Sequence, residues 1–435
     1  MSFKSKQLNR LGLVQAAAAI EQREISSVAL LQACLDRIEE RNAEVAAFVA
    51  YDSKKALAAA AEADNNTQLG PLRGIPFAVK DILDTADYPT EYGSPIYQGH
   101  QPHQDAVCVR LAKSRGAVLL GKVATGEFAT QTPSKAKNPL NLAHTPGGSS
   151  SGSAAAVGDY MVPVAYATQT TGSIIRPAVF CGVVGYKPTF DLISPAGMKD
   201  LSPSQDTVGI ITRSIEDAAF FTLGLHGAAT VRTASLKPRV ALCLSRQWDY
   251  VLPETMRAIE SLVHHLESAG CTVKRTWLPD EYDTLLAIQP RLFMYEARHA
   301  LVNERILHGD QLSHRLQTRL QLGEHIEYDE YVSMRQQVRE AQQKVETLFK
   351  GVDAVLYPAA AGEADEGLAS AGDPRFGALW TLLHLPSVSF PIDLGPKGLP
   401  LGVQMIARYG QDTRLLAVAN AVTSIIGPVG PEVSG

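Results

Sequence analysis

The sequence predicts an α/β fold in which a β-sheet is covered by helices. Short apolar segments with the pattern of strands alternate with longer segments whose apolar residues recur at helical spacing. Hydrophobic residues make up 45% of the 435 residues and charged residues 20%, which is typical of a globular protein and excludes a disordered chain. No internal repeat or inter-domain linker stands out, so we expect one continuous core.

The chain is expected to begin with helices. An apolar run over 11–20 is followed at once by charged residues, which indicates a short amphipathic helix. Helical spacing then extends from the expected N-cap Ser27 to about residue 40. The alanine-rich segment 54–63 predicts a further helix.

Strands and helices alternate along the rest of the chain. The segment 147–188 is unusually dense in Gly, Ser, Thr and Ala, and the segment 283–350 is mainly helical and rich in charge. The other expected helices cover residues 105–115, 254–270 and 413–425. The expected strands cover residues 75–80, 117–120, 239–244, 272–277, 354–357, 387–390 and 402–406.

Charge and composition exclude several classes of partner. The 40 Lys and Arg residues stand against 45 Asp and Glu, so the net charge is −5 and no basic field exists to hold nucleic acid. No stretch reaches the roughly 18 apolar residues that cross a bilayer, so no membrane association is expected. The five dispersed cysteines favour a reducing, cytoplasmic location over a disulfide framework.

One candidate motif is a phosphate-binding loop. Gly116 to Lys122 match GxxxxGK, but Val123 stands where such a loop needs Ser or Thr for magnesium. The four residues between the glycines form a strand-like run. A strand followed by a turn is therefore the expected structure.

A second candidate is the nucleophile elbow of a hydrolase. Residues 148–152 match GxSxG with Ser150 at the centre, and His384 could serve as the late histidine. Such an elbow follows a strand, whereas the preceding segment 138–147 is typical of a loop. We expect Ser150 to have a structural role.

A third candidate is a metal site built from histidines. His100 and His103 lie in a polar segment, and His264 and His265 occupy adjacent helical positions that do not face one ligand. No HExxH motif exists. We expect neither a metal nor a cofactor.

The remaining signal is spread over nearly the whole chain. Its central motifs are GGSSSGSAAA at 147–156, QTTGSIIRPA at 169–178 and CGVVGYKPT at 181–189. Its further motifs are GIPFAVKD at 74–81, GKVATGEFA at 121–129, DTVG at 206–209, LPSV at 385–388 and GLPLGVQ at 398–404. Together and in this order, these motifs resemble the amidase signature family.

The resemblance implies a single large mixed β-sheet covered by helices, in one domain over residues 1–435. The signature core would span about 74–215. The helical segment at about 283–350 and the loop 359–377 lie between or beside signature motifs, and we expect them to shape the acyl pocket.

The resemblance also implies a catalytic set in which Ser173 is the nucleophile, Ser149 the bridging serine and Lys80 the general base. A serine hydroxyl is a weak nucleophile until a base removes its proton, and a lysine can act as that base only when neutral. The apolar run before Lys80 is a suitable setting for a neutral amine. In the family the peptide before the bridging serine is cis, and two glycines at 147–148 permit such a backbone.

The loop before the nucleophile is expected to stabilise the oxyanion and bind substrate. Backbone N–H groups of Thr170, Thr171 and Gly172 would form the oxyanion hole. Gln169 replaces the Asp of the commonest family pattern and, with Ser151, resembles the malonamidase-like branch, which acts on small amides. Thr171 replaces a glycine, and a β-branched residue resists positive φ, so this substitution questions the loop geometry.

Arg176 lies three residues after the nucleophile and would face the acyl group if a helix begins there. A guanidinium holds a carboxylate through two parallel hydrogen bonds, and in the malonamidase-like branch the matching arginine is associated with the substrate's carboxylate. The alternative is that Arg176 anchors the loop to backbone carbonyls. The first interpretation predicts a small amide that carries a carboxylate near the scissile bond.

The predicted function is hydrolysis of a small carboxamide to a carboxylate and ammonia through an acyl-enzyme on Ser173. The expected partner is the small-molecule amide itself, with a homodimer possible. One alternative is the glutaminase-type subunit of a tRNA-dependent amidotransferase, for which the chain is somewhat short. Another is a catalytically silent binding protein on the same fold.

Overall fold

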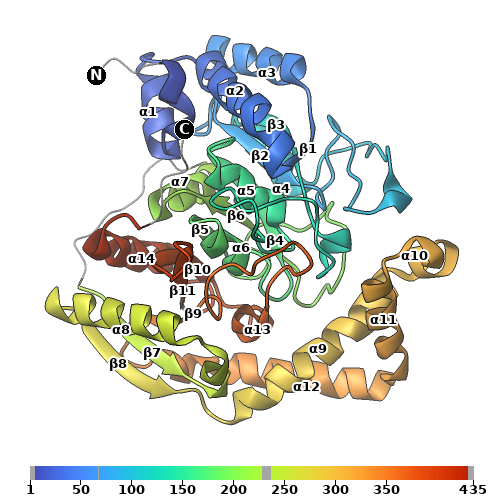
Figure 1. Ribbon diagram of the computed structural model, residues 1–435, viewed down its shortest axis with the longest axis vertical. Helices are drawn as coiled ribbons and strands as arrows, with labels where there is room; N and C mark the ends of the chain where they lie inside the picture. Colours follow the sequence, from blue (N-terminus) through green and yellow to red (C-terminus); the bar gives the residue numbers. More distant parts are fainter. Residues whose placement is uncertain (1–4, 67, 228–236, 430–435) are drawn as a thin grey trace.

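The computed structural model describes residues 5–66, 68–227 and 237–429, in which helices and strands alternate along the chain (Figure 1). The strands are β1 Phe48–Tyr51, β2 Pro76–Lys80, β3 Val118–Val123, β4 Val164–Gln169, β5 Val184–Lys187, β6 Thr207–Thr212, β7 Arg239–Leu244, β8 Thr272–Trp277, β9 Ala354–Pro358, β10 Ser387–Leu394 and β11 Pro400–Ile406. The α-helices are α1 Leu13–Glu21, α2 Ser27–Val45, α3 Ser53–Asn65, α4 Val107–Ser114, α5 Ser151–Gly158, α6 Ile175–Phe180, α7 Ile215–Leu225, α8 Pro253–Ser268, α9 Glu281–Ala300, α10 Val302–Leu307, α11 His314–Leu322, α12 Tyr328–Lys344, α13 Arg375–Leu382 and α14 Asp412–Ile426.

The strands of the described chain form one mixed sheet of eleven strands, in the order β1-β3-β2-β4-β6-β5-β10-β11-β9-β7-β8. The pairs of β2 with β3 and β4, and of β7 with β8 and β9, are parallel, and the other pairs are antiparallel. The single large mixed sheet covered by helices is therefore confirmed.

Helices cover both faces of this sheet, and the alternation of side chains along β2 shows how. Phe77 and Val79 point to the face that packs on α1, α4, α7, α8 and α14. Ala78 points to the opposite face, which packs on α2, α3, α5 and α6. Because side chains alternate along a strand, Lys80 belongs to the face of Ala78 and of α5. This alternation directs the lysine towards the start of α5.

Small residues let α5 lie directly against the strands. All eight of its residues are buried. A Cβ atom on Gly152 would lie 2.2 Å from the backbone nitrogen of Ala124 and 2.6 Å from the carbonyl oxygen of Ala47, so only glycine fits there. The close approach holds the first turn of α5 beside β2.

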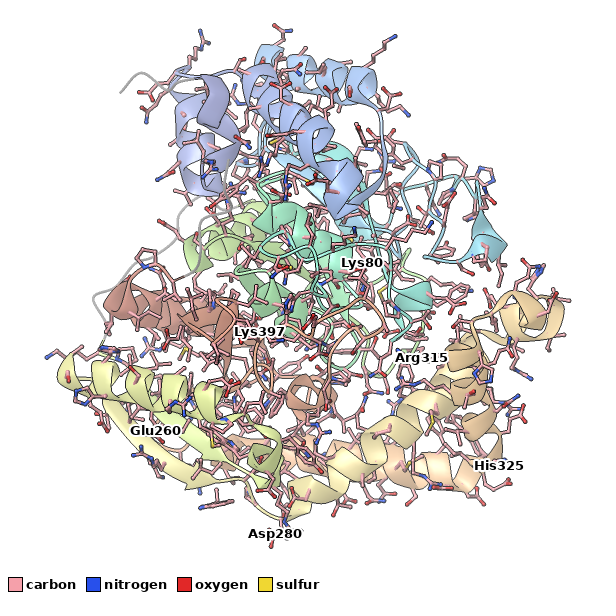
Figure 2. The ribbon with its side chains drawn as sticks, in the orientation of Figure 1. Lys80, Glu260, Asp280, Arg315, His325 and Lys397 are labelled. Atoms are coloured by element: carbon pink, nitrogen blue, oxygen red, sulfur yellow. The ribbon has the colours of Figure 1, made fainter. Side chains whose placement is uncertain are left out.

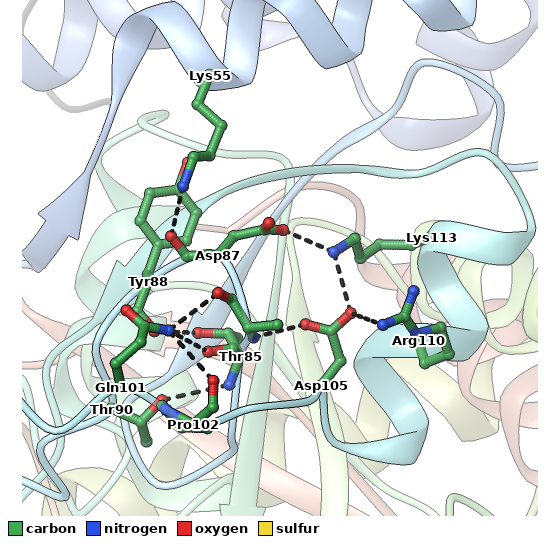
Figure 3. A network of polar contacts seen from close by, with 11 residues as sticks. Lys55, Thr85, Asp87, Tyr88, Thr90, Gln101, Pro102, Asp105, Arg110 and Lys113 are labelled. Carbon is green, nitrogen blue, oxygen red and sulfur yellow. Dashed lines mark hydrogen bonds and ion pairs between the residues drawn. The ribbon is translucent and has the colours of Figure 1, made fainter.

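Polar contacts hold the segment that leads from β2 to α4 (Figure 3). Gln101 donates from Nε2 to the carbonyl oxygen of Ala86 at 2.9 Å. Asp105 accepts from the backbone N–H of Ala86 at 2.8 Å and from Lys113 Nζ at 3.0 Å. These contacts hold the segment between β2 and α4 in place.

The helices α9, α11 and α12 extend together away from the body of the molecule, with α10 at their far end (Figure 1). They form the mainly helical segment expected over 283–350. The buried side of this arm includes Leu292 of α9 and Met334 of α12, which belong to one apolar cluster with Trp380 of α13. No helix of the described residues is long and apolar enough to cross a membrane.

The sequence patterns predicted most strands towards the edges of the sheet, but they did not predict several strands and helices at its centre. The bounds of β7 and β8 agree with the expected strands. The strands β1, β4, β5 and β6 and the helices α5, α6, α7 and α13 were not assigned from sequence. Strands β4, β5 and β6 and helices α5 and α6 are buried throughout, so no apolar-polar alternation marks them.

Two local predictions were wrong. Ser26, not Ser27, caps α2, because its Oγ accepts from the N–H of Ala29 at 3.0 Å, while Ser27 is buried and donates to the carbonyl oxygen of Gly74 at 2.9 Å. Lys122 and its preceding glycine lie inside β3 and not in a turn after it. Tertiary packing decides between the adjacent serines, which the sequence pattern does not distinguish.

Candidate active site

Lys80 is the buried centre of the candidate site. It is the last residue of β2, and its side chain is fully buried (Figure 2). Its Nζ lies 2.8 Å from Ser149 Oγ, 2.9 Å from Ser150 Oγ and 2.9 Å from Thr168 Oγ1. Burial lowers the pKa of Lys80 well below its ordinary value, and the charge of Asp206 opposes that shift only in part. The lysine can therefore be neutral and accept a proton.

Ser149 stands between the lysine and the cavity. The peptide bond between Gly148 and Ser149 is cis, as the resemblance implied. Gly147 has φ of +79°, and a Cβ atom there would lie 2.8 Å from the Cα of Pro177, so glycine is required. This backbone presents the Ser149 hydroxyl to Lys80 on one side and to the cavity on the other.

Ser150 contacts the same lysine, which the sequence analysis did not anticipate. Its hydroxyl donates to the carbonyl oxygen of Thr168 at 3.1 Å and lies within hydrogen-bond distance of Lys80 Nζ. Its position next to Ser149 in the motif was the available signal. His384 is not its partner, because that ring contacts the carbonyl oxygen of Ser204 at 2.8 Å and stacks on Phe190. The geometry does not support the elbow interpretation.

Ser173 lies in the loop between β4 and α6 and lines the same cavity as Ser149. Within the described residues its hydroxyl makes no hydrogen bond, so the expected contact from Ser149 to Ser173 is not formed. In that part of the chain the backbone N–H groups of Thr170, Thr171, Gly172 and Ser173 also lack an acceptor. The three predicted donors and that of Ser173 are thus free, and consecutive free donors beside a serine hydroxyl can stabilise a negative oxygen.

Neighbouring side chains fix this loop. Thr170 donates from Oγ1 to Asp206 at 2.5 Å, and the other oxygen of Asp206 accepts from the N–H groups of Leu201 and Ser202, both at 2.8 Å. A Cβ atom on Gly172 would lie 2.8 Å from the carbonyl oxygen of Pro374. The glycine therefore allows a close contact between two segments distant in sequence.

Thr171 does not distort the loop. It is absent from the non-glycine residues with positive φ in the described ranges, so its β-branch meets no steric conflict. Its hydroxyl accepts from Gln289 Nε2 at 3.2 Å, and its carbonyl oxygen accepts from Thr381 Oγ1 at 2.9 Å. The residue instead links the loop to α9 and α13.

The expectation that Gln169 binds substrate is not supported by its position. Its side chain is fully buried and does not line the cavity. Its Oε1 accepts from the N–H groups of Ile174 and Ile175 at 2.8 and 3.1 Å, and its Nε2 donates to Thr381 Oγ1 at 2.9 Å. Gln169 thus satisfies free N–H groups at the start of α6. It therefore supports the loop of Ser173 without reaching the cavity.

Arg176 is used mostly as an anchor. Its Nε donates to the carbonyl oxygen of Ala371 at 2.7 Å, and its Nη2 donates to that of Gly148. Only Nη1 remains without a partner among the described residues, and the side chain lines the cavity. Burial lowers the pKa of Arg176 to about 10. Two of its three nitrogens bind carbonyl groups, as the anchoring alternative expected, and the grip on a carboxylate stays a prediction.

These residues surround a cavity of about 350 Å³, a size suited to a small ligand. Its wall includes α9 and α11 as well as Pro374, which supports the expectation for 283–350 and for the loop 359–377. A larger cavity of about 900 Å³ lies between α7 and α14. None of the candidate catalytic residues lines that larger cavity, so size alone does not identify the site.

The histidine pairs form no metal centre in the described chain. His100, His103, His264 and His265 are exposed. No group of three or more His, Cys, Asp or Glu residues within the described ranges could hold a metal ion. The chemistry available at the site comes from hydroxyl, amine and backbone N–H groups.

Two serine hydroxyls and free N–H donors on one cavity, with a buried lysine behind Ser149, are the arrangement of a serine hydrolase. The family model for amidases matches residues 29–416. The chain belongs to the amidase signature family, whose members hydrolyse the C–N bonds of amides.

Known proteins of two kinds are similar to this chain. The A subunit of the glutamyl-tRNA(Gln) amidotransferase from Anaeromyxobacter sp. (strain K) is 31% identical, over 99% of each chain, and that from Methylococcus capsulatus is 31% identical over 95% of this chain and 96% of its own. A solved amidase superposes with a TM-score of 0.88 at 26% identity, covering 96% of this chain and 100% of its own. The peptide amidase of Stenotrophomonas maltophilia has a TM-score of 0.84 at 26% identity, covering 97% and 98%.

Proposed function

We propose that the protein hydrolyses a small carboxamide to a carboxylate and ammonia through an acyl-enzyme on Ser173. The observation that carries this proposal is the buried Lys80, whose amine is hydrogen-bonded to Ser149 on the cavity that Ser173 also lines. A neutral amine in this position can draw a proton through one hydroxyl from another.

In the first half of the reaction Ser149 passes its proton to Lys80 and receives the proton of Ser173. The Ser173 oxygen then attacks the amide carbon, and the free N–H groups of residues 171–173 stabilise the negative oxygen. The proton returns through Ser149 to the leaving nitrogen, the C–N bond breaks and ammonia departs. The contact from Ser149 to Ser173 forms as substrate binds, because catalytic hydrogen bonds often reach their final geometry only in the complex with substrate.

In the second half a water molecule gives a proton to the same relay and attacks the acyl carbon. The bond between the acyl carbon and Ser173 breaks, and the serine oxygen recovers a proton from Lys80 through Ser149. The products are a carboxylic acid, which ionises, and the original enzyme. All proton transfers use groups of this chain.

A second candidate is the glutaminase-type subunit of a tRNA-dependent amidotransferase, which would pass ammonia to partner subunits. It is favoured by the amidotransferase relatives. The match to the Anaeromyxobacter relative runs over 495 aligned positions against the 435 residues of this chain, so the chain is shorter than that subunit, as expected. Ammonia release from small amides by the isolated chain supports the first candidate, and release from glutamine only when partner subunits are added supports the second.

A catalytically silent binding protein is tested separately. We expect an alkyl fluorophosphonate to label Ser173, with the modified peptide identified by mass spectrometry. Ser173→Ala should abolish both labelling and turnover. A wild-type protein that binds amides but neither reacts with the label nor releases ammonia would be a binding protein.

Location and assembly remain predictions. The five free cysteines are all buried, which suits a cytoplasmic protein. A homodimer is expected to show as twice the mass of 46.8 kDa in light scattering after size-exclusion chromatography.

A further inference from the structure

The cavity next to Ser173 has positive charge but no negative charge of its own. Arg176 and Arg319 line it, and no Asp or Glu does so among the described residues. Most of the wall contributed by the arm is apolar, from Pro290, Phe293 and Met294 of α9 and Leu322 of α11. A ligand that fits this cavity would be largely apolar along its length and anionic where it meets a guanidinium.

Arg319 is the less occupied of the two guanidinium groups. It lies in α11, and its Nη2 donates to Gln131 Oε1. Within the described ranges it forms no ion pair, and its Nε and Nη1 have no acceptor. Arg176 by contrast has one free nitrogen, since backbone carbonyls take the other two. Of the two, only Arg319 keeps two nitrogens without a partner, Nε and Nη1, for the two oxygens of a carboxylate.

Arg315 provides an internal comparison. It lies one turn before Arg319 on α11 and between the arm and the body of the molecule (Figure 2). Its Nη1 donates to the backbone carbonyl oxygen of Gln131 at 3.0 Å, but the residue does not line the cavity. Both arginines thus hold the same loop, and only Arg319 also faces the cavity.

We propose that Arg319 binds an anionic group at the end of the acyl chain remote from the scissile bond. This rests on the proposed amide hydrolysis and specifies its substrate as a primary amide whose short apolar chain ends in a carboxylate. The product would then be a dicarboxylate. Arg319 would determine specificity, while Arg176 holds the loop of the nucleophile in place.

The kinetic test compares ω-carboxy primary amides with unbranched alkyl amides of the same chain length. Arg319→Gln should raise KM for the ω-carboxy amides roughly 10- to 100-fold, the range expected for losing hydrogen bonds between charged groups, with kcat little changed. KM for the alkyl amides should stay within about twofold. Arg319→Lys should recover part of the affinity, because it restores the charge without the paired geometry.

Arg315→Gln is the matched control. If Arg319 acts only by anchoring the loop at Gln131, both variants should change the two kinds of substrate equally. Equal effects on charged and neutral amides, or no effect of Arg319→Gln, would overturn the proposal.

A binding measurement separates this proposal from the proposed function. Titration calorimetry with glutarate and adipate on the Ser173→Ala protein requires no turnover. We expect Arg319→Gln in that background to weaken dicarboxylate binding at least tenfold and Arg315→Gln to leave it unchanged. Unchanged binding after loss of Arg319 contradicts the assignment even when amides are hydrolysed. Weakened binding without any ammonia release by the wild type would instead contradict the proposed hydrolysis.

Discussion

Three lysines are buried in the described chain, Lys80, Lys122 and Lys187, and their contacts distinguish a base from a scaffold. Lys122 of β3 forms an ion pair with Asp81 at 3.0 Å and donates to the carbonyl oxygen of Leu83 at 3.0 Å. Lys80 contacts serine and threonine oxygens and no carboxylate. Burial lowers the pKa of all three lysines, and Lys187 donates to the carbonyl oxygen of Pro188 at 2.8 Å. Of the three, only Lys80 contacts a serine that lines the cavity of Ser173.

The first prediction concerns pH. Because the pKa of Lys80 is lowered, its neutral fraction grows as pH rises through that lowered value. The rate should therefore rise with pH and reach a plateau well below the ordinary lysine range, in a plot of kcat/KM against pH. Lys80→Ala should lose this rise together with roughly 10²- to 10⁴-fold of the rate. A wild-type rate that falls steadily above neutral pH would contradict a neutral lysine base.

The second prediction concerns the two serines that contact Lys80. Ser149→Ala should lower kcat more than Ser150→Ala, because only Ser149 also lines the cavity. It should nevertheless be milder than Ser173→Ala or Lys80→Ala, since a water molecule can partly replace the relay. Ser150→Ala should shift the pH profile, because it removes an oxygen that contacts the lysine. Equal losses of kcat in Ser149→Ala and Ser150→Ala would argue against a relay through Ser149.

At the scale of elements, the loop that carries Ser173 leads into the short helix α6. A buried side chain accepts hydrogen bonds from the first N–H groups of this helix. Gln169 at the end of β4 accepts from two N–H groups at the start of α6 and donates to α13. A helix of six residues has few hydrogen bonds of its own, so these contacts define where it begins. The helix in turn places Arg176 against the carbonyl oxygen of Gly148.

The third prediction follows from this arrangement. Gln169→Leu should lower the free energy of unfolding by about 1–3 kcal/mol, the cost of leaving buried polar groups without partners. It should also lower kcat, because the loop of Ser173 loses its support. Denaturant titration and steady-state kinetics measure the two effects. Gln336→Leu, at an exposed position of α12, should change the stability by less than about 0.5 kcal/mol. Equal stability of the two variants would show that Gln169 does not hold the loop.

At the scale of the whole molecule, one continuous sheet contains strands from the N-terminal and the C-terminal parts of the described chain. β1 and β8 are its edges, and the centre holds β4, β6, β5 and β10, next to the nucleophile loop and α6. Because no boundary interrupts the ladder of strands, local unfolding of one part exposes the apolar faces of the next. This continuity supports the single domain expected over residues 1–435.

The fourth prediction is that the protein unfolds in one cooperative transition. Scanning calorimetry should give a single peak whose calorimetric and van't Hoff enthalpies agree within experimental error, if unfolding is reversible. Circular dichroism and tryptophan fluorescence should give the same midpoint. Two separated peaks would show that the part around β7 and β8 is an independent domain.

The sequence alone determined the family, the sheet with its helical cover, and the candidate residues Lys80, Ser149 and Ser173. These residues lie in contiguous motifs whose glycines and serines serve local backbone geometry, such as the positive φ of Gly147. Local requirements of this kind are visible in a short stretch of sequence.

Only the tertiary structure decided how the side chains around them are used. Two nitrogens of Arg176 donate to Ala371 and Gly148, and Arg319 lines the cavity from a helix far along the chain. Hydrogen bonds between distant segments leave no periodicity or motif in the sequence, because they depend on how the helices and strands pack in space. For the same reason the sequence left both a carboxylate and an anchoring role open for Arg176, and it gave no sign of Arg319, whose Nε and Nη1 have no partner in the described chain.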